Sequence, residues 1–196
     1  MKRPNVIRLA ALALLLALLL GACGAPSFRG TVLDPPIEVP DFQLIDEHGQ
    51  PWRLSEQRGK VVFLFFGYTS CPDVCPTTLA SWSQAYRGLG KDAGRVRFVF
   101  VTVDPERDTP ERLAMHVDAF EPDFVGLTGP QADLEAVYNI FGVYHEKDTS
   151  SQSALGYLVS HTATAFVLDP EGRWRLDESY GTLPEDLVHD ARQLME

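Results

Sequence analysis

The sequence contains few cysteines, a shortage of basic residues and no apolar run long enough to cross a membrane. Three cysteines occur in 196 residues, and 17 Lys and Arg stand against 27 Asp and Glu, a formal net charge of −10. An acidic surface repels phosphate groups, which excludes nucleic acids and anionic lipid headgroups as partners. The same surface tolerates a metal cation or a basic patch on a partner protein.

Two of the three cysteines, Cys71 and Cys75, are separated by only three residues. A disulfide that closes so small a ring removes little entropy from the unfolded chain, so it would be a weak structural staple. A redox pair or a metal site explains such a close pair better than a structural disulfide does.

The longest apolar run, Leu9 to Leu20, is made only of Leu and Ala and follows three basic residues. It is shorter than the about 20 residues that a spanning helix needs. Because Leu20-Gly21-Ala22-Cys23 follows, we expect a lipoprotein signal peptide over residues 1–22 and a lipid on Cys23. An ordinary signal peptide or a weak membrane anchor is the alternative.

A lipoprotein of this kind is extracytoplasmic and contacts the membrane through its lipid anchor alone. Removal of the signal takes the three basic residues with it, which leaves 14 basic against 27 acidic residues, a net charge near −13. Residues 23–40 contain four prolines and few regular apolar positions, which is typical of a tether. Residues 41–196 are then expected to form one domain. The sequence shows no internal repeat and no low-complexity tract beyond the tether.

The hydrophobic pattern of the domain alternates between strands and helices. A short N-terminal hairpin is expected around residues 47–50, and residues 147–153 are polar and expected to be mobile. Strands are predicted near 61–66, 96–103, 162–168 and 173–179, and helices near 79–89, from 110 onward, at 134–141 and at 183–194. This order predicts an α/β sandwich with a central mixed sheet.

The segment GYTSCPDVCPTT follows the predicted strand 61–66, at the sheet edge where open α/β folds bind ligands. Pro76 suits the first turn of a helix, so Cys75 lies at a helix start. The positive end of the helix favours thiolates, the form of cysteine that attacks disulfides and binds metals. Two thiolates favour Cu(I) above other ions. A four-coordinate zinc site would need another ligand.

A third ligand has to come from elsewhere in the chain, and the five histidines are the candidates. His161 opens an apolar stretch after a polar one, so it is expected at the edge of the sheet beside the cysteines. His145 is a weaker competitor, and the remaining three lie in a hairpin turn, a helix and the C-terminal region: His48, His116 and His189. A hydrogen-bonded structural histidine remains the alternative for His161.

Three segments in this order, GYTSCPDVCPTT, VDPERDTP and SHTATAFVLDPEG followed by SYG, closely resemble the Sco/SenC family. The resemblance covers nearly the whole domain. It implies a thioredoxin-like, three-layer fold and copper bound through Cys71, Cys75 and His161. We expect Cu(I) as the bound ion, with Cu(II) as a second state.

The family is implicated in assembling the binuclear copper centre of cytochrome c oxidase. The resemblance therefore implies a copper metallochaperone whose partner is cytochrome c oxidase subunit II, or another copper or thiol protein. The alternative is an extracytoplasmic thiol-disulfide oxidoreductase in which Cys71 attacks and Cys75 resolves. A peroxidase of the peroxiredoxin class ranks last, because Thr69 is only two positions before Cys71 and no proline precedes it in the loop.

Acidic residues flank the predicted site. Asp73 is expected to cap the helix start, with tuning of the charge of the site or contact with a partner as the alternative. Asp104-Pro105 and Arg107-Asp108 lie at the rim of the site and are explained adequately by turn formation.

Overall fold

The computed structural model describes residues 27–153 and 156–196. The predicted signal peptide (1–22) and Cys23 lie outside these ranges. Within them, no helix combines the length and the apolar character needed to span a bilayer.

Eight strands form one central sheet that mixes parallel and antiparallel pairs. β4, β5 and β6 pair in parallel, whereas all other neighbours are antiparallel. In sheet order the strands are β1 (Thr31–Glu38), β10 (Arg173–Glu178), β9 (Ala165–Leu168), β4 (Val61–Gly67), β5 (Val96–Thr102), β6 (Val125–Thr128), β2 (Gln43–Asp46) and β3 (Pro51–Arg53). The predicted mixed sheet and the N-terminal hairpin, β2–β3, are confirmed.

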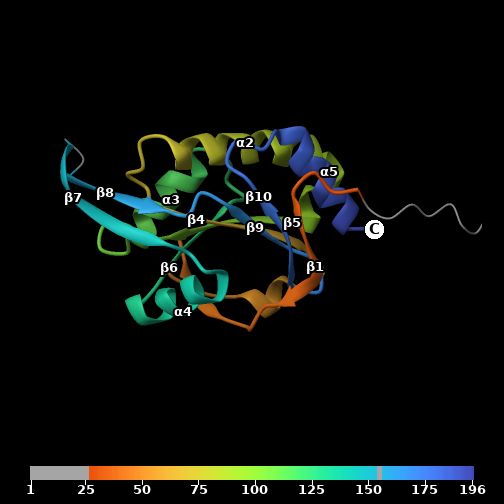
Figure 1. The fold of residues 1–196 in the computed structure, drawn as a ribbon, viewed down its shortest axis with the longest axis horizontal. Helices are drawn as coiled ribbons and strands as arrows, with labels where there is room; N and C mark the ends of the chain where they lie inside the picture. Colours follow the sequence, from red (N-terminus) through yellow and green to blue (C-terminus); the bar gives the residue numbers. More distant parts are fainter. Residues whose placement is uncertain (1–26, 154–155) are drawn as a thin grey trace, which may run out of the picture.

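Helices cover both faces of this sheet, which gives three layers (Figure 1). One face carries α2 (Val74–Leu89), α3 (Pro110–Asp118) and α5 (Pro184–Leu194), and the other carries α4 (Gln131–Phe141). Two short 3-10 helices, η1 (Leu54–Gln57) and η2 (Gly90–Arg95), complete the connections. The predicted three-layer α/β class is confirmed.

The central strand β4 explains how the layers pack, because every residue in it is buried. Its side chains alternate between the two faces. Phe65 contacts Trp82 of α2 with 6.1 Å between ring centroids, and Phe66 contacts Phe141 of α4 at 5.6 Å. A continuous apolar run is therefore what this position requires.

The predicted tether over residues 23–40 is wrong for residues 31–38, which form β1 and pair with β10. The four-proline pattern was misleading because β1 is an edge strand, where proline is tolerated. Its register with β10 shifts between Val32 and Ile37, so Pro35 and Pro36 lie where the pairing is interrupted.

Two buried carboxyl groups join the N-terminal segment to α5 and β10. Asp190 of α5 accepts hydrogen bonds from the backbone N–H groups of Arg29 and Gly30, at 2.9 and 2.7 Å. Burial, with the nearby charge of Asp190, raises the pKa of Glu178 to about 8. A Cβ at Gly30 would lie 2.8 Å from the Glu178 carboxyl oxygen, so this close approach requires glycine.

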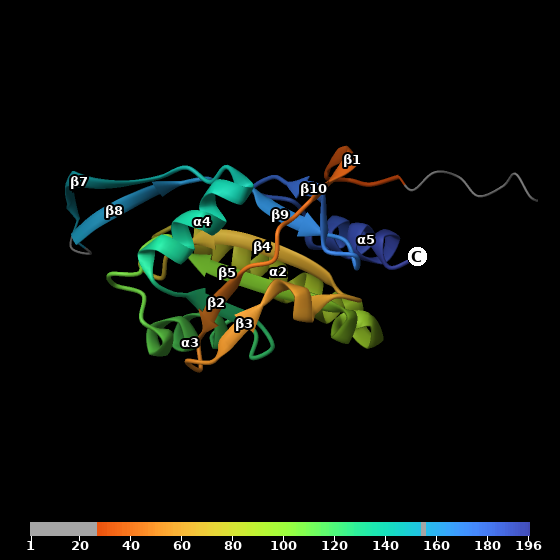
Figure 2. The same cartoon turned by 90° about the horizontal axis from the view of Figure 1, so that it is seen from below.

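Two further strands, β7 (His145–Ser153) and β8 (Gly156–His161), form a separate antiparallel pair that we call the arm. Figures 1 and 2 show the arm projecting beyond the main sheet on the side away from the C-terminus. Two expectations are corrected here. Residues 147–153, expected as a polar mobile segment, belong to β7, which pairs with β8 at residues 145–148 and at Ser153, and His161 ends β8 instead of opening the next strand.

Candidate metal centre

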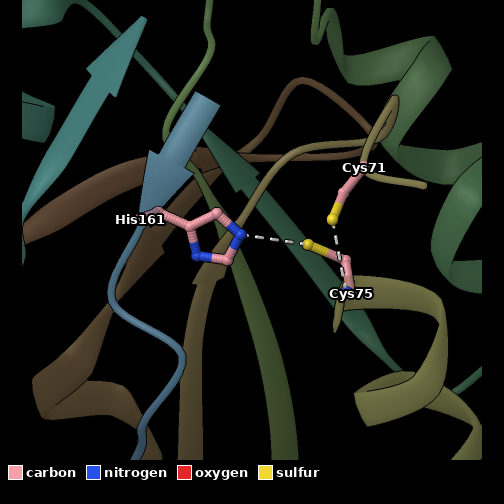
Figure 3. Close-up of side chains that lie close together, drawn as sticks. All are labelled: Cys71, Cys75 and His161. Atoms are coloured by element: carbon pink, nitrogen blue, oxygen red, sulfur yellow. Dashed lines mark hydrogen bonds between the residues drawn. The ribbon is translucent and has the colours of Figure 1, made fainter. Parts of the chain in front are cut away.

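Three side chains from two distant parts of the chain meet beside the carboxyl end of β4 (Figure 3). Cys71 lies in the loop that follows β4, and Cys75 is the second residue of α2. His161 is the last residue of β8 and brings its ring in from the base of the arm. The loop after a central strand is the place where the sequence predicted a site.

The three potential ligand atoms form a compact group. The Cys75 Sγ and His161 Nε2 atoms are 3.5 Å apart, and the Cys75 backbone N–H donates to Cys71 Sγ at 3.5 Å. All three ligand atoms lie within 4.8 Å of one another, and both cysteines are free thiols. Among the described residues, this is the one group of three or more such side chains close enough to hold a metal ion.

A backbone contact fixes which nitrogen of His161 faces the sulfurs. His161 Nδ1 is 3.0 Å from the carbonyl oxygen of Thr162, which only accepts hydrogen bonds. Nδ1 therefore carries the proton, and the lone pair of Nε2 points to the thiols, the arrangement typical of metal-ligating histidines. The rings of Phe65 and Tyr68 lie edge-on to the imidazole, each with centroids 5.8 Å away, and limit its motion.

Cys75 is wholly buried, whereas Cys71 is half-buried. The Cys75 sulfur occupies space that a side chain at Gly67 would fill, because a Cβ there would be 2.7 Å from Cys75 Sγ and 2.8 Å from the Phe100 ring. The glycine that opens GYTSCPDVCPTT thus makes room for the inner sulfur.

The pKa values of the two thiols are shifted in opposite directions. A hydrogen bond from the Cys75 side chain lowers the pKa of Cys71 well below its usual value, and the backbone N–H groups of Asp73 and Cys75 act in the same direction. Burial raises the pKa of Cys75, and the neighbouring Cys71 thiolate raises it further. The metal-free pair therefore favours one proton, on Cys75, and a thiolate on the more accessible Cys71.

The other four histidines lie outside this group and have structural partners. His48 contacts Glu47, His145 contacts Glu135, His189 contacts the Ser27 carbonyl, and His116 packs on the Phe100 ring: their separations are 3.5 Å, 3.5 Å, 2.8 Å and 5.3 Å between centroids. His145 is paired directly opposite His161 in the arm, yet its ring turns toward Tyr138 of α4.

Sequence reasoning underestimated the two aspartates after β5. Asp108 is completely buried and accepts from the backbone N–H of Thr69 at 3.0 Å, from its hydroxyl at 2.6 Å and from the Thr102 hydroxyl at 2.7 Å. Asp108 therefore fixes the start of the cysteine loop, a role that turn formation does not describe. Asp104 is also completely buried. Two carboxylates following a continuous buried strand were the available signal.

The expected capping role of Asp73 is wrong. Asp73 occupies the N-cap position of α2, but its side chain makes no capping hydrogen bond. Its φ of −143° and ψ of −72° depart from the extended backbone that a capping side chain normally requires. The exposed carboxylate instead lines the mouth of the cleft formed by the cysteine loop and β8.

The mixed sheet, its helical layers and a two-thiol, one-imidazole group at the end of β4 define a thioredoxin-like protein with a candidate metal centre. A model of the SCO1/SenC family matches residues 32–196. The chain belongs to the SCO1/SenC family.

Solved and curated relatives agree with this assignment. The apo Sco1 protein of Thermus thermophilus is 44% identical, with a TM-score of 0.77 over 89% of this chain and 99% of that chain. Bradyrhizobium japonicum ScoI with copper bound is 36% identical, with a TM-score of 0.73 over 80% of this chain and 98% of that chain. A putative copper-binding protein of Stutzerimonas stutzeri is 32% identical over 166 residues, 79% of this chain and 80% of that protein.

Proposed function

We propose that this protein binds one copper ion through Cys71 Sγ, Cys75 Sγ and His161 Nε2 and delivers it to the binuclear copper centre of cytochrome c oxidase. One observation carries the proposal: three ligand atoms, two of them 86 residues apart in the chain, lie within 4.8 Å of one another. The similarity to ScoI with copper bound supports copper as the ion.

The donor set favours Cu(I). Soft thiolates select Cu(I), and two thiolates with a neutral imidazole give a Cu(I) site with a net charge of −1. Cys75 has to lose its proton when the ion binds, so loading releases a proton. Cys71 is half-buried at the mouth of the cleft, so a thiol of the recipient can reach the ion from that side before a ligand of this protein leaves.

Anaerobic titration tests the ligand assignment. The reduced full chain, carrying Cys23→Ser so that its third thiol is absent, competes with bicinchoninate for Cu(I). The same measurement is made on Cys71→Ser, Cys75→Ser and His161→Ala. Each change should weaken binding by more than the about 10–100-fold that loss of an outer-shell hydrogen bond costs. If all four proteins bind Cu(I) alike, these residues are not the copper ligands.

A second candidate function is thiol-disulfide exchange, which the unequal thiols favour. The Cys71 thiolate would attack a target disulfide, forming a mixed disulfide and releasing one target thiolate, which takes up a proton. Cys75 would then lose its proton and attack the Cys71 sulfur, releasing the second target thiol and leaving a Cys71–Cys75 disulfide. Two electrons pass to the target, whose copper-ligand cysteines become reduced.

The two functions make different demands on His161. Copper binding requires its imidazole, whereas disulfide reduction requires only the cysteine pair. A wild-type protein that binds no Cu(I) but reduces a protein disulfide, with His161→Ala equally active, would establish the oxidoreductase instead of the metallochaperone.

We also propose that the protein is an extracytoplasmic lipoprotein anchored through Cys23. The signal pattern over residues 1–22 supports this proposal. Labelling cells with a radioactive fatty acid should mark the wild-type protein and leave Cys23→Ser unmarked. Equal labelling of both proteins would exclude Cys23 as the attachment site.

A further inference from the structure

The position of His161 depends on how the base of the arm is held. His161 ends β8, and the arm forms a two-stranded sheet separate from the main sheet. Side chains at alternate positions of a strand share a face, so Tyr157, Val159 and His161 point the same way. Val159 is buried, which shows that this face is turned toward the body of the protein.

At the first of these positions, Tyr157 is attached to the loop after β5. Its hydroxyl donates to Asp104 Oδ1 at 2.6 Å, and its backbone carbonyl accepts from Arg107 Nη1 at 3.1 Å. The Arg107 guanidinium lies 3.7 Å from the centroid of the Tyr157 ring. Arg107 Nε also donates to Asp104, whose carboxylate is completely buried.

The same guanidinium lies near a ring that packs on His161. Arg107 lies 5.6 Å from the centroid of the Tyr68 ring, and Tyr68 is in turn edge-on to His161. The cation therefore lies within cation–π distance of both Tyr157 of the arm and Tyr68 of the cysteine loop. Hydrogen bonds to a buried carboxylate and cation–π contacts are strong enough to hold this geometry.

A second contact between the arm and this loop is weaker. Lys147 of β7 lies 2.6 Å from Glu106, but both side chains are exposed. Exposed ion pairs contribute little to stability because water screens their charges. The contacts of Tyr157 with buried Asp104 and with Arg107 thus hold the arm more firmly than this surface pair does.

We propose that Asp104, Arg107 and Tyr157 are positioning residues that place His161 beside the two thiols, so that they control the contribution of the imidazole to metal binding. This inference rests on the proposed copper-binding function. It gives the segment VDPERDTP a role in the site although none of its residues belongs to the ligand group.

Tyr157→Phe tests the proposal, because it removes the hydroxyl bond to Asp104 and keeps the aromatic ring. Tyr144→Phe is the matched control, since Tyr144 stands one residue before β7, its hydroxyl donates to Glu146 of β7, and its side chain is exposed. Cu(I) affinity is measured by bicinchoninate competition on the full chain carrying Cys23→Ser. Tyr157→Phe should bind about tenfold more weakly, the scale of an outer-shell contact. Tyr144→Phe should match the wild type.

A double variant shows whether the effect passes through the imidazole. In a His161→Ala background, Tyr157→Phe should cause no further loss of affinity. An equal loss in both backgrounds would overturn the positioning role. Wild-type affinity in Tyr157→Phe would overturn it too, while leaving the copper ligands themselves intact.

A metal-free readout separates this inference from the copper proposal. In the reduced apo protein, NMR cross-peaks between the rings of His161 and Tyr68 should weaken in Tyr157→Phe and persist in Tyr144→Phe. Cross-peaks of wild-type intensity in Tyr157→Phe would refute the inference whether or not the protein binds copper. A wild-type protein that binds no Cu(I) would refute the proposed function alone.

Discussion

Gly67→Ala adds one methyl group directly against the inner sulfur of the candidate site. The new Cβ would lie 2.7 Å from Cys75 Sγ and 2.8 Å from Phe100, whereas ordinary van der Waals contact begins at 3.4 Å. The sulfur therefore has to move by about 0.7 Å, unless the backbone moves instead. Neither neighbour has room to retreat, because Cys75 and Phe100 are wholly buried.

The size of both effects follows from this displacement. Metal sites tolerate ligand distances within about 0.2 Å of ideal, so a larger shift should weaken Cu(I) binding by about 10–100-fold. Overpacking a buried site costs about 1–3 kcal/mol, so the free energy of unfolding of the metal-free protein should fall by that amount. Urea unfolding of the reduced apo protein and anaerobic Cu(I) competition measure the two effects.

Gly94→Ala is the matched control. Gly94 lies in η2, and a Cβ there would have no atom within 4 Å. This change should leave Cu(I) affinity unchanged and stability within about 0.5 kcal/mol of the wild type. If Gly67→Ala also matches the wild type in both measurements, the argument that Gly67 makes room for the Cys75 sulfur is refuted.

Three other predictions follow from the same structure. Because burial raises the pKa of Cys75, Cu(I) displaces a proton there, and affinity should rise by about tenfold per pH unit near neutrality; a pH-independent dissociation constant in buffered competition assays would contradict this. Because the raised pKa of Glu178 is about 8 against 4.5 for an ordinary glutamate, unfolding releases its proton and the stability it contributes falls as pH rises through that window. As the pH rises from 4.5 to 8, the free energy of unfolding measured with urea should therefore fall less in Glu178→Gln than in the wild type. An equal dependence on pH in both proteins would contradict the raised pKa of Glu178. Copper should slow hydrogen exchange across residues 147–159, because the bound ion would link His161 to the thiols. Identical exchange with and without copper would show that copper binding does not affect this segment.

Much of the fold was predictable because the strongest signals are local. The continuous apolar run of β4 required burial on both faces. A helix from residue 110 onward was predicted, and α3 begins there, with the Thr109 hydroxyl accepting from the Arg112 N–H. The edge strand β1 and the arm were missed for a different reason. β1 contains prolines and β7 is polar. β1 depends on pairing with β10, and β7 depends on pairing with β8, and the periodicity of a single segment does not report such pairing.

The candidate site was likewise predictable only where the signal is local. The spacing of Cys71 and Cys75 and their place after a buried strand predicted a reactive pair from the sequence alone. His161 is 86 residues away from Cys75 along the chain, so pattern singled it out from the other histidines only weakly, and the family resemblance supplied the rest. The roles of Asp104 and Asp108 depend on hydrogen bonds to residues far away in the sequence, at Tyr157 and Thr69, which no local pattern encodes.

X-ray absorption spectroscopy of the anaerobic Cu(I)-loaded protein tests the central claim most directly, because it identifies the atoms bound to the ion. We expect two sulfur scatterers and one imidazole nitrogen in the wild type, with the imidazole signal absent in His161→Ala. A wild-type spectrum without an imidazole contribution, or one that His161→Ala leaves unchanged, would contradict the account.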